Sequence, residues 1–238
     1  MNKVRLIDMH SHILPKADHG CSSVSMSVNL VQKAKSCGVE AIAATPHFYH
    51  HRTTVSDFLD LRERCYDDLM NGLEKAGLGD FRIVKGAEVT IETELIGVSS
   101  EDLSKLCYEN TDYILLEMPF VTWSDWVFKT IDAIKHKHGL NPIIAHIERY
   151  SDPMINELYD EMHVAQFNAD IAARLFSRKE IINLYNNDSV HIMGSDLHND
   201  TTRNYDNFIK AGKKLPADML EQLYANSMAI LNNKDLHY

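Results

Sequence analysis

The stretch IDMHSHILPKADHG, residues 7–20, places four metal-binding residue types close together directly after a short apolar run. His10 and His12 are alternate residues of a predicted strand, so their imidazoles point to the same side of the sheet. Asp18 and His19 follow after a short loop. The arrangement predicts that the first strand of the chain ends at a metal site.

Outward from this stretch, short apolar runs alternate with amphipathic segments, which is the pattern of βα units around a parallel sheet. Helical periodicity predicts helices beginning at Ser22 or Ser23 and at Ser56, and further helices within 124–139 and 216–231. No repeat or linker breaks the pattern, so we expect one α/β domain over residues 1–238, a length typical of α/β barrels. The predicted strands cover residues 4–8, 40–46, 82–88, 113–117, 142–148, 164–169 and 191–196.

Possible metal ligands lie at or just after the carboxyl ends of six of these seven strands. In a parallel barrel all such ends open on one face, so residues distant in sequence meet there. A lone His-x-His pair or a lone Glu is weak evidence, but their coincidence on six strands predicts a site for two or three ions at ~3–4 ligands each. The sixth strand offers Asn168 instead. The candidates are His10, His12, Asp18 or His19, His47, Glu88, Glu117, His146, Asp196 and His198.

The composition restricts the possible partners and location. The formal net charge of −10 argues against a nucleic-acid surface, which needs clustered Lys and Arg. No apolar run approaches the length of a membrane span, so we expect no stable membrane insertion. The four cysteines form no C-x-x-C pair, which favours reduced thiols and a cytoplasmic protein. The oligomeric state is left open by the sequence.

The candidate ligands are His, Asp and Glu without Cys, a donor set that suits hydrolytic Mn, Fe, Zn or Mg sites better than structural zinc. Glu88 and Glu117 are expected to bridge ions, because one carboxylate can bind two metals. A cysteine-dependent tyrosine phosphatase is excluded, since that chemistry needs an Arg six residues after the Cys. The residues at that spacing are Ser27, Ala43, Asn71 and Tyr113.

The motifs DMHSH, TPH, GAE, LLE, AHIERY and SDLHND with a following Arg resemble the PHP (polymerase and histidinol phosphatase) family. Within it, they resemble the CpsB/YwqE type, the bacterial tyrosine-protein phosphatases of capsule and exopolysaccharide operons. The resemblance implies a distorted (β/α)7 barrel similar to a TIM barrel, with its metal site at the C-terminal ends of the strands. It also implies three metal ions, often Mn or Fe. Together with the ligand count and donor set, this leads us to expect two to three divalent ions, with Mn favoured and Fe, Zn or Mg as alternatives.

The resemblance also implies a role for each candidate residue. Relatives read Asp-Asp-Gly where this chain has Asp18-His19-Gly20, so which of Asp18 and His19 is a ligand stays open. Arg149 and Arg203 match phosphate-binding arginines, and His19, if it binds no metal, is a candidate general acid. The implied ligands are His10, His12, Glu88 and Asp196 for the first ion, Asp18 or His19 with His47 and His198 for the second, and Glu117 and His146 with bridging Glu88 for the third.

We therefore expect a metal-dependent phosphomonoesterase that attacks phosphorus with a metal-bridging hydroxide. The resemblance favours a protein-tyrosine phosphatase whose substrate is a bacterial tyrosine autokinase of polysaccharide synthesis. The main alternative is a PHP phosphatase of a small metabolite, such as histidinol phosphate or a sugar phosphate. An amidohydrolase-type C–N hydrolase is less favoured, because no predicted strand ends in a Lys that could bridge two metals. A metal-stabilised regulatory domain is also less favoured, because it would not need the phosphate-facing Arg149 and Arg203.

Aromatic residues cluster in two predicted rim loops, after the second and the fourth strand. They are candidates for a lip that stacks a phosphotyrosine ring. The alternative, that they pack helices onto the barrel, applies above all to Trp126 and Phe120. The set comprises Phe48, Tyr49, Phe120, Trp123 and Trp126.

Overall fold

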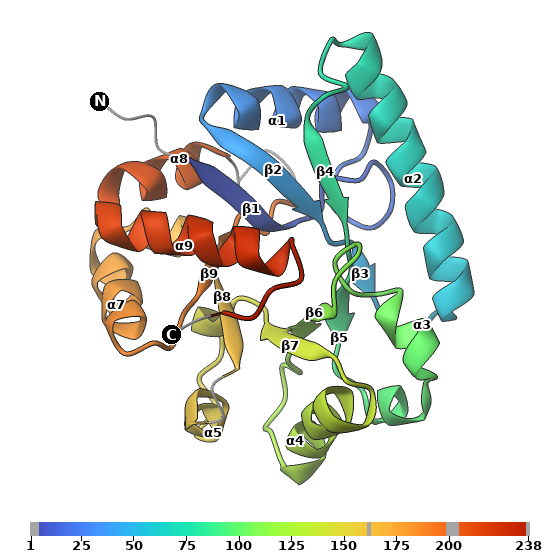
Figure 1. Ribbon diagram of the computed structural model, residues 1–238, viewed down its shortest axis with the longest axis vertical. Helices are drawn as coiled ribbons and strands as arrows, with labels where there is room; N and C mark the ends of the chain where they lie inside the picture. Colours follow the sequence, from blue (N-terminus) through green and yellow to red (C-terminus); the bar gives the residue numbers. More distant parts are fainter. Residues whose placement is uncertain (1–4, 161–162, 199–204, 237–238) are drawn as a thin grey trace.

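Parallel strands form the centre of the molecule and helices surround them (Figure 1). The computed structural model describes residues 5–160, 163–198 and 205–236. All strand pairings in these residues are parallel, in the orders β1-β2-β4 and β3-β5-β6-β7-β8-β9. The strands are β1 (Leu6–Ser11), β2 (Val39–Ala44), β3 (His47–Phe48), β4 (Arg82–Lys85), β5 (Glu88–Thr90), β6 (Tyr113–Glu117), β7 (Asn141–Ile144), β8 (Val164–Asn168) and β9 (Ile192–Gly194).

The two sheets are continuous with each other, because two strands run from one sheet into the other with a short interruption. β2 continues into β3 after Thr45 and Pro46, and Pro46 has no N–H to donate to a neighbouring strand. β4 continues into β5 after Gly86 and Ala87. The backbone N–H of Gly86 donates to Ala44 at 2.9 Å, and that of Glu88 donates to Pro46 at 3.0 Å. The pairing therefore continues across both interruptions.

The other edge strands of the two sheets are β1 and β9, and β1 pairs with the residues that follow β9. The backbone N–H of Asp196 donates to the carbonyl of His10 at 2.7 Å, and that of His12 donates to Leu197 at 3.0 Å. A parallel bridge also joins Ser11 and Leu197. With this closure the described strands occupy seven positions around a distorted α/β barrel, as the sequence predicted.

The helices cover the outside of the strands, and α9 lies across β1 and β9 (Figure 1). The predicted cap of the first helix is confirmed: Ser23 Oγ accepts from the N–H of Met26 at 3.2 Å. The second helix begins at Val55, one residue earlier than expected, with Thr54 as its cap. The helices are α1 (Val24–Ser36), α2 (Val55–Lys75), α3 (Ser100–Ser104), α4 (Asp125–Asp132), α5 (Ile155–Asp160), α6 (Ala169–Ala172), α7 (Leu175–Asn186), α8 (Tyr205–Lys214) and α9 (Ala217–Ile230).

All seven predicted strands form, but several of them, and one predicted helix, end earlier than expected. The helix expected within 124–139 is α-helical only to Asp132 and continues as a π turn over Ala133–Lys137. The fifth strand ends at Ile144 rather than at 148, because His146 has a left-handed backbone with φ of 32° and a 3₁₀ turn follows over Ile147–Arg149. Among the described residues, no helix is long and apolar enough to cross a membrane.

The barrel interior changes from apolar to polar along the strands. A cluster of buried apolar side chains fills the interior of the barrel. On β6, Tyr113 and Leu115 belong to this interior cluster, and Glu117 is the next residue on the same face. On β8, Val164 belongs to this cluster, and Gln166 is next on its face, followed by Asn168. The period of two therefore brings the polar side chains together at the carboxyl ends of the strands.

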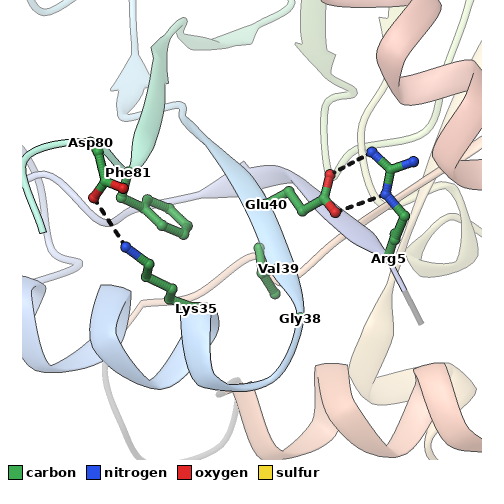
Figure 2. A pocket seen from close by; sticks show the side chains of 7 residues that line it. All are labelled: Arg5, Lys35, Gly38, Val39, Glu40, Asp80 and Phe81. Atoms are coloured by element: carbon green, nitrogen blue, oxygen red, sulfur yellow. Dashed lines mark hydrogen bonds and ion pairs between the residues drawn. The ribbon is translucent and has the colours of Figure 1, made fainter. Parts of the chain in front are cut away.

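A cavity of 270 Å³ lies at the opposite end, where β1, β2 and β4 begin (Figure 2). Its charged side chains pair with one another. Arg5 binds the carboxylate of Glu40 through two hydrogen bonds of 2.8 and 2.9 Å, and Lys35 Nζ lies 3.0 Å from Asp80 Oδ1. These pairs account for the charged side chains that line the cavity. The candidate site lies instead at the carboxyl ends of the strands, where buried polar atoms form no hydrogen bond within the described residues.

Candidate metal centre

Glu88 lies at the centre of the histidines that the sequence singled out. Its Oε2 atom is 3.2 Å from Nε2 of His10, 3.2 Å from Nε2 of His12 and 3.0 Å from Nδ1 of His47. Its other oxygen, Oε1, is 2.8 Å from Nε2 of His146. Side chains from β1, β3, β5 and the segment after β7 thus converge on one carboxylate, and Glu88 is only 1% exposed.

The other predicted carboxylates adjoin this cluster. Oδ1 of Asp196 lies 3.2 Å from Nδ1 of His198 and 3.5 Å from Nε2 of His12. Oε1 of Glu117 lies 3.7 Å from Nε2 of His146. Three groups have ligand atoms close enough to hold one ion each, all within 4.8 Å of one another: His10, His12 and Glu88; His12, His47 and His198; and His47, Glu88 and Glu117.

Four buried polar atoms of the cluster lie close together but form no hydrogen bond within the described part of the chain. They are Nε2 of His10, Nε2 of His12, Nδ1 of His47 and Oε2 of Glu88. A buried polar atom without a partner costs about 1–3 kcal/mol, so natural folds rarely keep such atoms together. Divalent cations bound between these side chains would satisfy the four atoms. The residues present therefore fit divalent metal ions.

The cluster shifts the pKa values of its members in different directions. Burial alone would lower the pKa values of His10 and His12, but the neighbouring carboxylates raise them. Burial and the neighbouring charge of Glu88 raise the pKa of Glu117 to about 7. Burial lowers the pKa of His47 to about 3, so this imidazole is neutral at physiological pH, as a ligand must be. Buried carboxylates that repel one another require positive charge nearby, and divalent ions supply it.

Asp18 is surrounded by groups of the protein itself. Its Oδ2 lies 2.6 Å from Nδ1 of His12 and accepts from the backbone N–H of His47 at 3.1 Å, and its Oδ1 accepts from the N–H of Gly20 at 2.8 Å. Burial alone would raise the pKa of Asp18, but these contacts, above all the one to His12, hold it well below its usual range. The carboxylate is therefore engaged in orienting a ligand ring and the loop behind it.

His19 faces the cluster instead. Its ring centroid is 4.8 Å from that of His47 and 4.4 Å from that of His198, and its side chain lines the 290 Å³ cavity over Glu88. Partial burial and the nearby His198 lower the pKa of His19, which favours a neutral ring. Of the two residues that the sequence left open, His19 has the position that suits a ligand.

A hydrogen-bonded chain on β8 supports the ligands, and sequence reasoning had identified only its Asn168, without a role. Gln166 Oε1 lies 3.0 Å from Nδ1 of His10 and accepts from the backbone N–H of His146 at 2.8 Å. Its Nε2 donates to Asn168 Oδ1 at 3.0 Å, and Asn168 Nδ2 donates to Asp196 Oδ2 at 2.9 Å. Such contacts fix the tautomer and orientation of ligands. The period of two on the sixth strand is the signal that finds both residues.

Two further buried residues escaped the sequence analysis. Tyr150 Oη lies 3.0 Å from Nδ1 of His146 and accepts from the N–H of Met118 at 2.9 Å. Asp8 accepts from the N–H of Ser195 at 2.7 Å and from the hydroxyl of Tyr205 at 2.9 Å. Asp8 and Tyr150 stand in the motifs DMHSH and AHIERY, but no local pattern gives them a role. Asp8 contacts residues distant in sequence, and Tyr150 joins His146 to Met118.

Close backbone approach at β9 sets the position of Asp196. A Cβ atom on Gly194 would lie 2.5 Å from Cβ of His10, so only glycine fits at this position of β9, where it faces His10 on β1. Asp196 itself has a left-handed backbone, with φ of 46°. Such conformations in residues other than glycine are uncommon and gather at functional sites.

Arg149, the first predicted phosphate-binding arginine, lies at the cavity. Its Nη1 atom is 3.6 Å from Oδ2 of Asp196, and its side chain is 33% exposed. It lines the cavity together with Glu117 and His198. A guanidinium in this position can reach an anion held at the cluster. Arg203, the second predicted arginine, lies outside the described residues.

The predicted aromatic lip is wrong for most of its members. Phe48 and Trp123 are buried in the core, and Trp126 packs against it, which confirms the alternative given for Trp126. Tyr49 lines the metal-binding cavity, with its ring 5.2 Å from that of His47. Phe120, for which helix packing was a strong alternative, is 62% exposed.

Comparison with known proteins gives the same family as the motifs. The family model described as capsular polysaccharide synthesis, CpsB/CapC, matches residues 6–236. The tyrosine-protein phosphatase YwqE of Bacillus subtilis is 26% identical over 245 residues, covering 97% of this chain and 93% of the relative. The tyrosine-protein phosphatase CpsB of Streptococcus pneumoniae is 26% identical over 214 residues, covering 82% and 83%.

A solved structure has the same fold. It comes from the crystal structures of YwqE from Bacillus subtilis and CpsB from Streptococcus pneumoniae, described as metal-dependent tyrosine phosphatases. The TM-score is 0.79 at 24% sequence identity, and the match covers 98% of this chain and 96% of the other. At this identity the likeness establishes the barrel.

Proposed function

Because the chain belongs to the CpsB/CapC family of capsular polysaccharide synthesis, we propose that it is a metal-dependent phosphatase that hydrolyses phosphotyrosine in proteins. The observation that carries the proposal is the set of unpartnered imidazole nitrogens of His10, His12 and His47 around Oε2 of Glu88. Such a set binds divalent ions, and clustered divalent ions are suited to phosphate esters. The relatives named above as tyrosine-protein phosphatases supply the substrate class.

We propose two to three ions, with Mn favoured and Fe, Zn or Mg as alternatives. Glu88 belongs to two of the three ligand groups and is the bridging ligand. His12 and His47 also belong to two groups each, which differs from the simple partition that the resemblance implied. The remaining ligands are His10, His19, Glu117, His146, Asp196 and His198, with Asp18 as the partner that orients His12.

When bound, the ions activate water near neutral pH and neutralise the charge of the phosphoryl group. The chain contributes the orientation. Arg149 directs its planar donor fork into the cavity, where it can hold phosphoryl oxygens that the ions leave free. A tyrosine leaving group has a pKa of about 10, so its departure depends less on a general acid than that of an alkoxide. His19 is therefore assigned to metal binding rather than to proton donation.

We further propose that the substrate is a tyrosine autokinase of polysaccharide synthesis. The description of the family and the activity in the names of its relatives support a phosphotyrosine protein of that process. The spacing of the four cysteines, which favours reduced thiols, supports a cytoplasmic location for the reaction.

The test compares kcat/KM of the metal-loaded protein for a phosphotyrosyl peptide with kcat/KM for histidinol phosphate and for a sugar phosphate. We expect the peptide to be the best substrate. A higher kcat/KM for either small ester would instead assign the protein to metabolite hydrolysis, since the metal cluster suits both reactions.

A further inference from the structure

A second cavity opens beside the metal-binding cavity. This side cleft has a volume of 830 Å³ and lies between residues 119–123, which follow β6, and residues 149–153, which follow β7. Arg149 lines both cavities, so the side cleft begins where the metal-binding cavity ends. Its volume is in the range of sites that bind organic ligands.

The wall of the side cleft on the β6 side is apolar and open to solvent. Phe120 is 62% exposed and Val121 is 64% exposed, and both belong to the few large apolar side chains exposed on the described residues. The Phe120 ring lies 6.4 Å from the ring of His146, nearly parallel to it at 21°. The guanidinium of Arg149 lies 5.0 Å from the centroid of the Phe120 ring. Exposed apolar groups directly beside a polar centre indicate a binding surface.

The two walls are tied together by hydrogen bonds. Oδ2 of Asp152 accepts from the N–H of Trp123 at 2.9 Å, and its Oδ1 accepts from the N–H of Met154 at 3.0 Å. Trp123 is 4% exposed, and its indole N–H donates to the carbonyl of Pro119 at 3.0 Å. The side cleft is therefore preformed, which lowers the entropic cost of binding.

The chemistry of the side cleft selects its occupant. Both oxygens of Asp152 accept from backbone N–H groups, the exposed wall is apolar at Phe120 and Val121, and Arg149 lies at one end of the side cleft. The cavity over Glu88, at 290 Å³, has room for a phosphoryl group but not for the polypeptide that carries it. The net charge of −10 disfavours a strongly acidic partner.

We infer that the side cleft binds the polypeptide segment next to the phosphotyrosine, with an apolar side chain of that segment against Phe120 and Val121. This inference rests on the proposed phosphotyrosine activity and extends it to the choice of substrate sequence. Phosphotyrosine flanked by apolar residues in an extended, accessible segment is the preferred substrate. Flanking acidic residues weaken binding, because no free cation other than Arg149 lines the described walls.

The experiment uses Val121→Asp, which places a charge in the side cleft at an exposed position that is not a proposed metal ligand. Leu175→Asp is the matched control, since Leu175 is 57% exposed and lies on α7, outside the side cleft. Two fluorescent peptides carry a non-hydrolysable phosphonate analogue of phosphotyrosine, one flanked by Leu and one by Asp. Fluorescence anisotropy gives Kd for each metal-loaded variant, and p-nitrophenyl phosphate and a Leu-flanked phosphotyrosyl peptide report turnover.

We expect the parent to bind the Leu-flanked peptide about tenfold or more tightly than the Asp-flanked peptide. Val121→Asp should weaken binding of the Leu-flanked peptide by a similar factor, and should lower kcat/KM for the phosphotyrosyl peptide far more than for p-nitrophenyl phosphate. Leu175→Asp should bind like the parent.

Equal affinity of parent and Val121→Asp for the Leu-flanked peptide would overturn the inference. A change of oligomeric state in Val121→Asp, measured by sedimentation, would also overturn it, because the side cleft would then bind a second copy of the chain. Val121-dependent binding without turnover of either phosphate ester would support the side cleft and contradict the proposed phosphatase activity. The two failures are therefore distinguishable.

Discussion

Nδ1 of His12 lies 2.6 Å from Oδ2 of Asp18, while Nε2 of the same ring lies 3.2 Å from Oε2 of Glu88. The carboxylate thus fixes one nitrogen of the ring and turns the other towards the cluster. This relationship supports the proposed division of roles, in which Asp18 orients His12 and the adjacent His19 binds metal; the sequence could not distinguish the two residues. Carboxylates that orient a ligand histidine typically change metal affinity by 10–100-fold when they are removed.

Asp18→Asn should therefore lower metal affinity by about 10–100-fold and leave the number of ions bound at saturation unchanged. His19→Ala should instead reduce the number of ions bound. Metal titrations followed by elemental analysis of both variants measure the two quantities. The roles are reversed if Asp18→Asn loses an ion at saturating metal while His19→Ala keeps the full number.

Glu88→Ala should be the most damaging single change to the metal centre. Its carboxylate belongs to two of the ligand groups, whereas His198 belongs to one. We expect Glu88→Ala to retain less metal than His198→Ala after identical loading and gel filtration. Equal and full metal content in the two variants would contradict a bridging Glu88.

Arg149→Ala should lower kcat/KM for a phosphotyrosyl peptide by roughly 10²–10³, the scale for removing one preorganised transition-state donor. Metal content should not change, because Arg149 is not a ligand. Arg149→Lys should recover little activity, since an ammonium lacks the planar donor fork. Steady-state kinetics with parallel metal analysis test this, and turnover within a few-fold of the parent in Arg149→Ala would refute it.

His191, far from the metal centre, should make the protein sensitive to mild acid. Burial lowers the pKa of His191 to about 4, with Asp188 acting in the opposite direction, and its Nδ1 accepts from the N–H of Ala165 at 3.0 Å. Because the unfolded residue has a pKa of about 6.5, the unfolded chain binds more protons between pH 6.5 and 4. Stability is therefore lost as the pH falls through this window, by up to about 3 kcal/mol at its lower end.

His191→Asn keeps a hydrogen-bond acceptor but does not titrate, and so serves as the comparison. Denaturant unfolding at pH 7 and at pH 4.5 should show a smaller loss of unfolding free energy in this variant than in the parent. The same loss in both proteins would exclude His191 as the source of the acid sensitivity.

The sequence predicted the strands and the convergence of ligands because both follow from local rules. Apolar runs mark the strands, and parallel strands in a barrel carry their carboxyl ends to one face. The left-handed backbone at His146 was beyond such rules. His146 is held by contacts from Gln166, which is distant in sequence, and from Tyr150, whose place in the AHIERY motif does not reveal its side-chain partner.

The residues that support the ligands could be predicted only in part. Gln166 and Asn168 alternate on the sixth strand as Val164 and Gln166 do, so their face could be read from the sequence. The pairing of Asp8 with Tyr205 joins β1 to α8, and no local pattern encodes such a contact. For the same reason Phe120 and Trp123 were assigned the wrong way round. Helix packing was considered above all for Phe120 and not for Trp123, whereas tertiary packing exposes Phe120 and buries Trp123.

The most direct measurement follows hydrolysis of a phosphotyrosyl peptide by the protein before chelation, after chelation and after Mn is restored, with an iodoacetamide-treated sample in parallel. If the cluster around Glu88 is the catalytic centre, chelation abolishes turnover, Mn or a similar ion restores it, and alkylation of the cysteines has little effect. Full turnover in the chelated protein, together with loss of turnover on alkylation, would contradict a metal-dependent mechanism at this site.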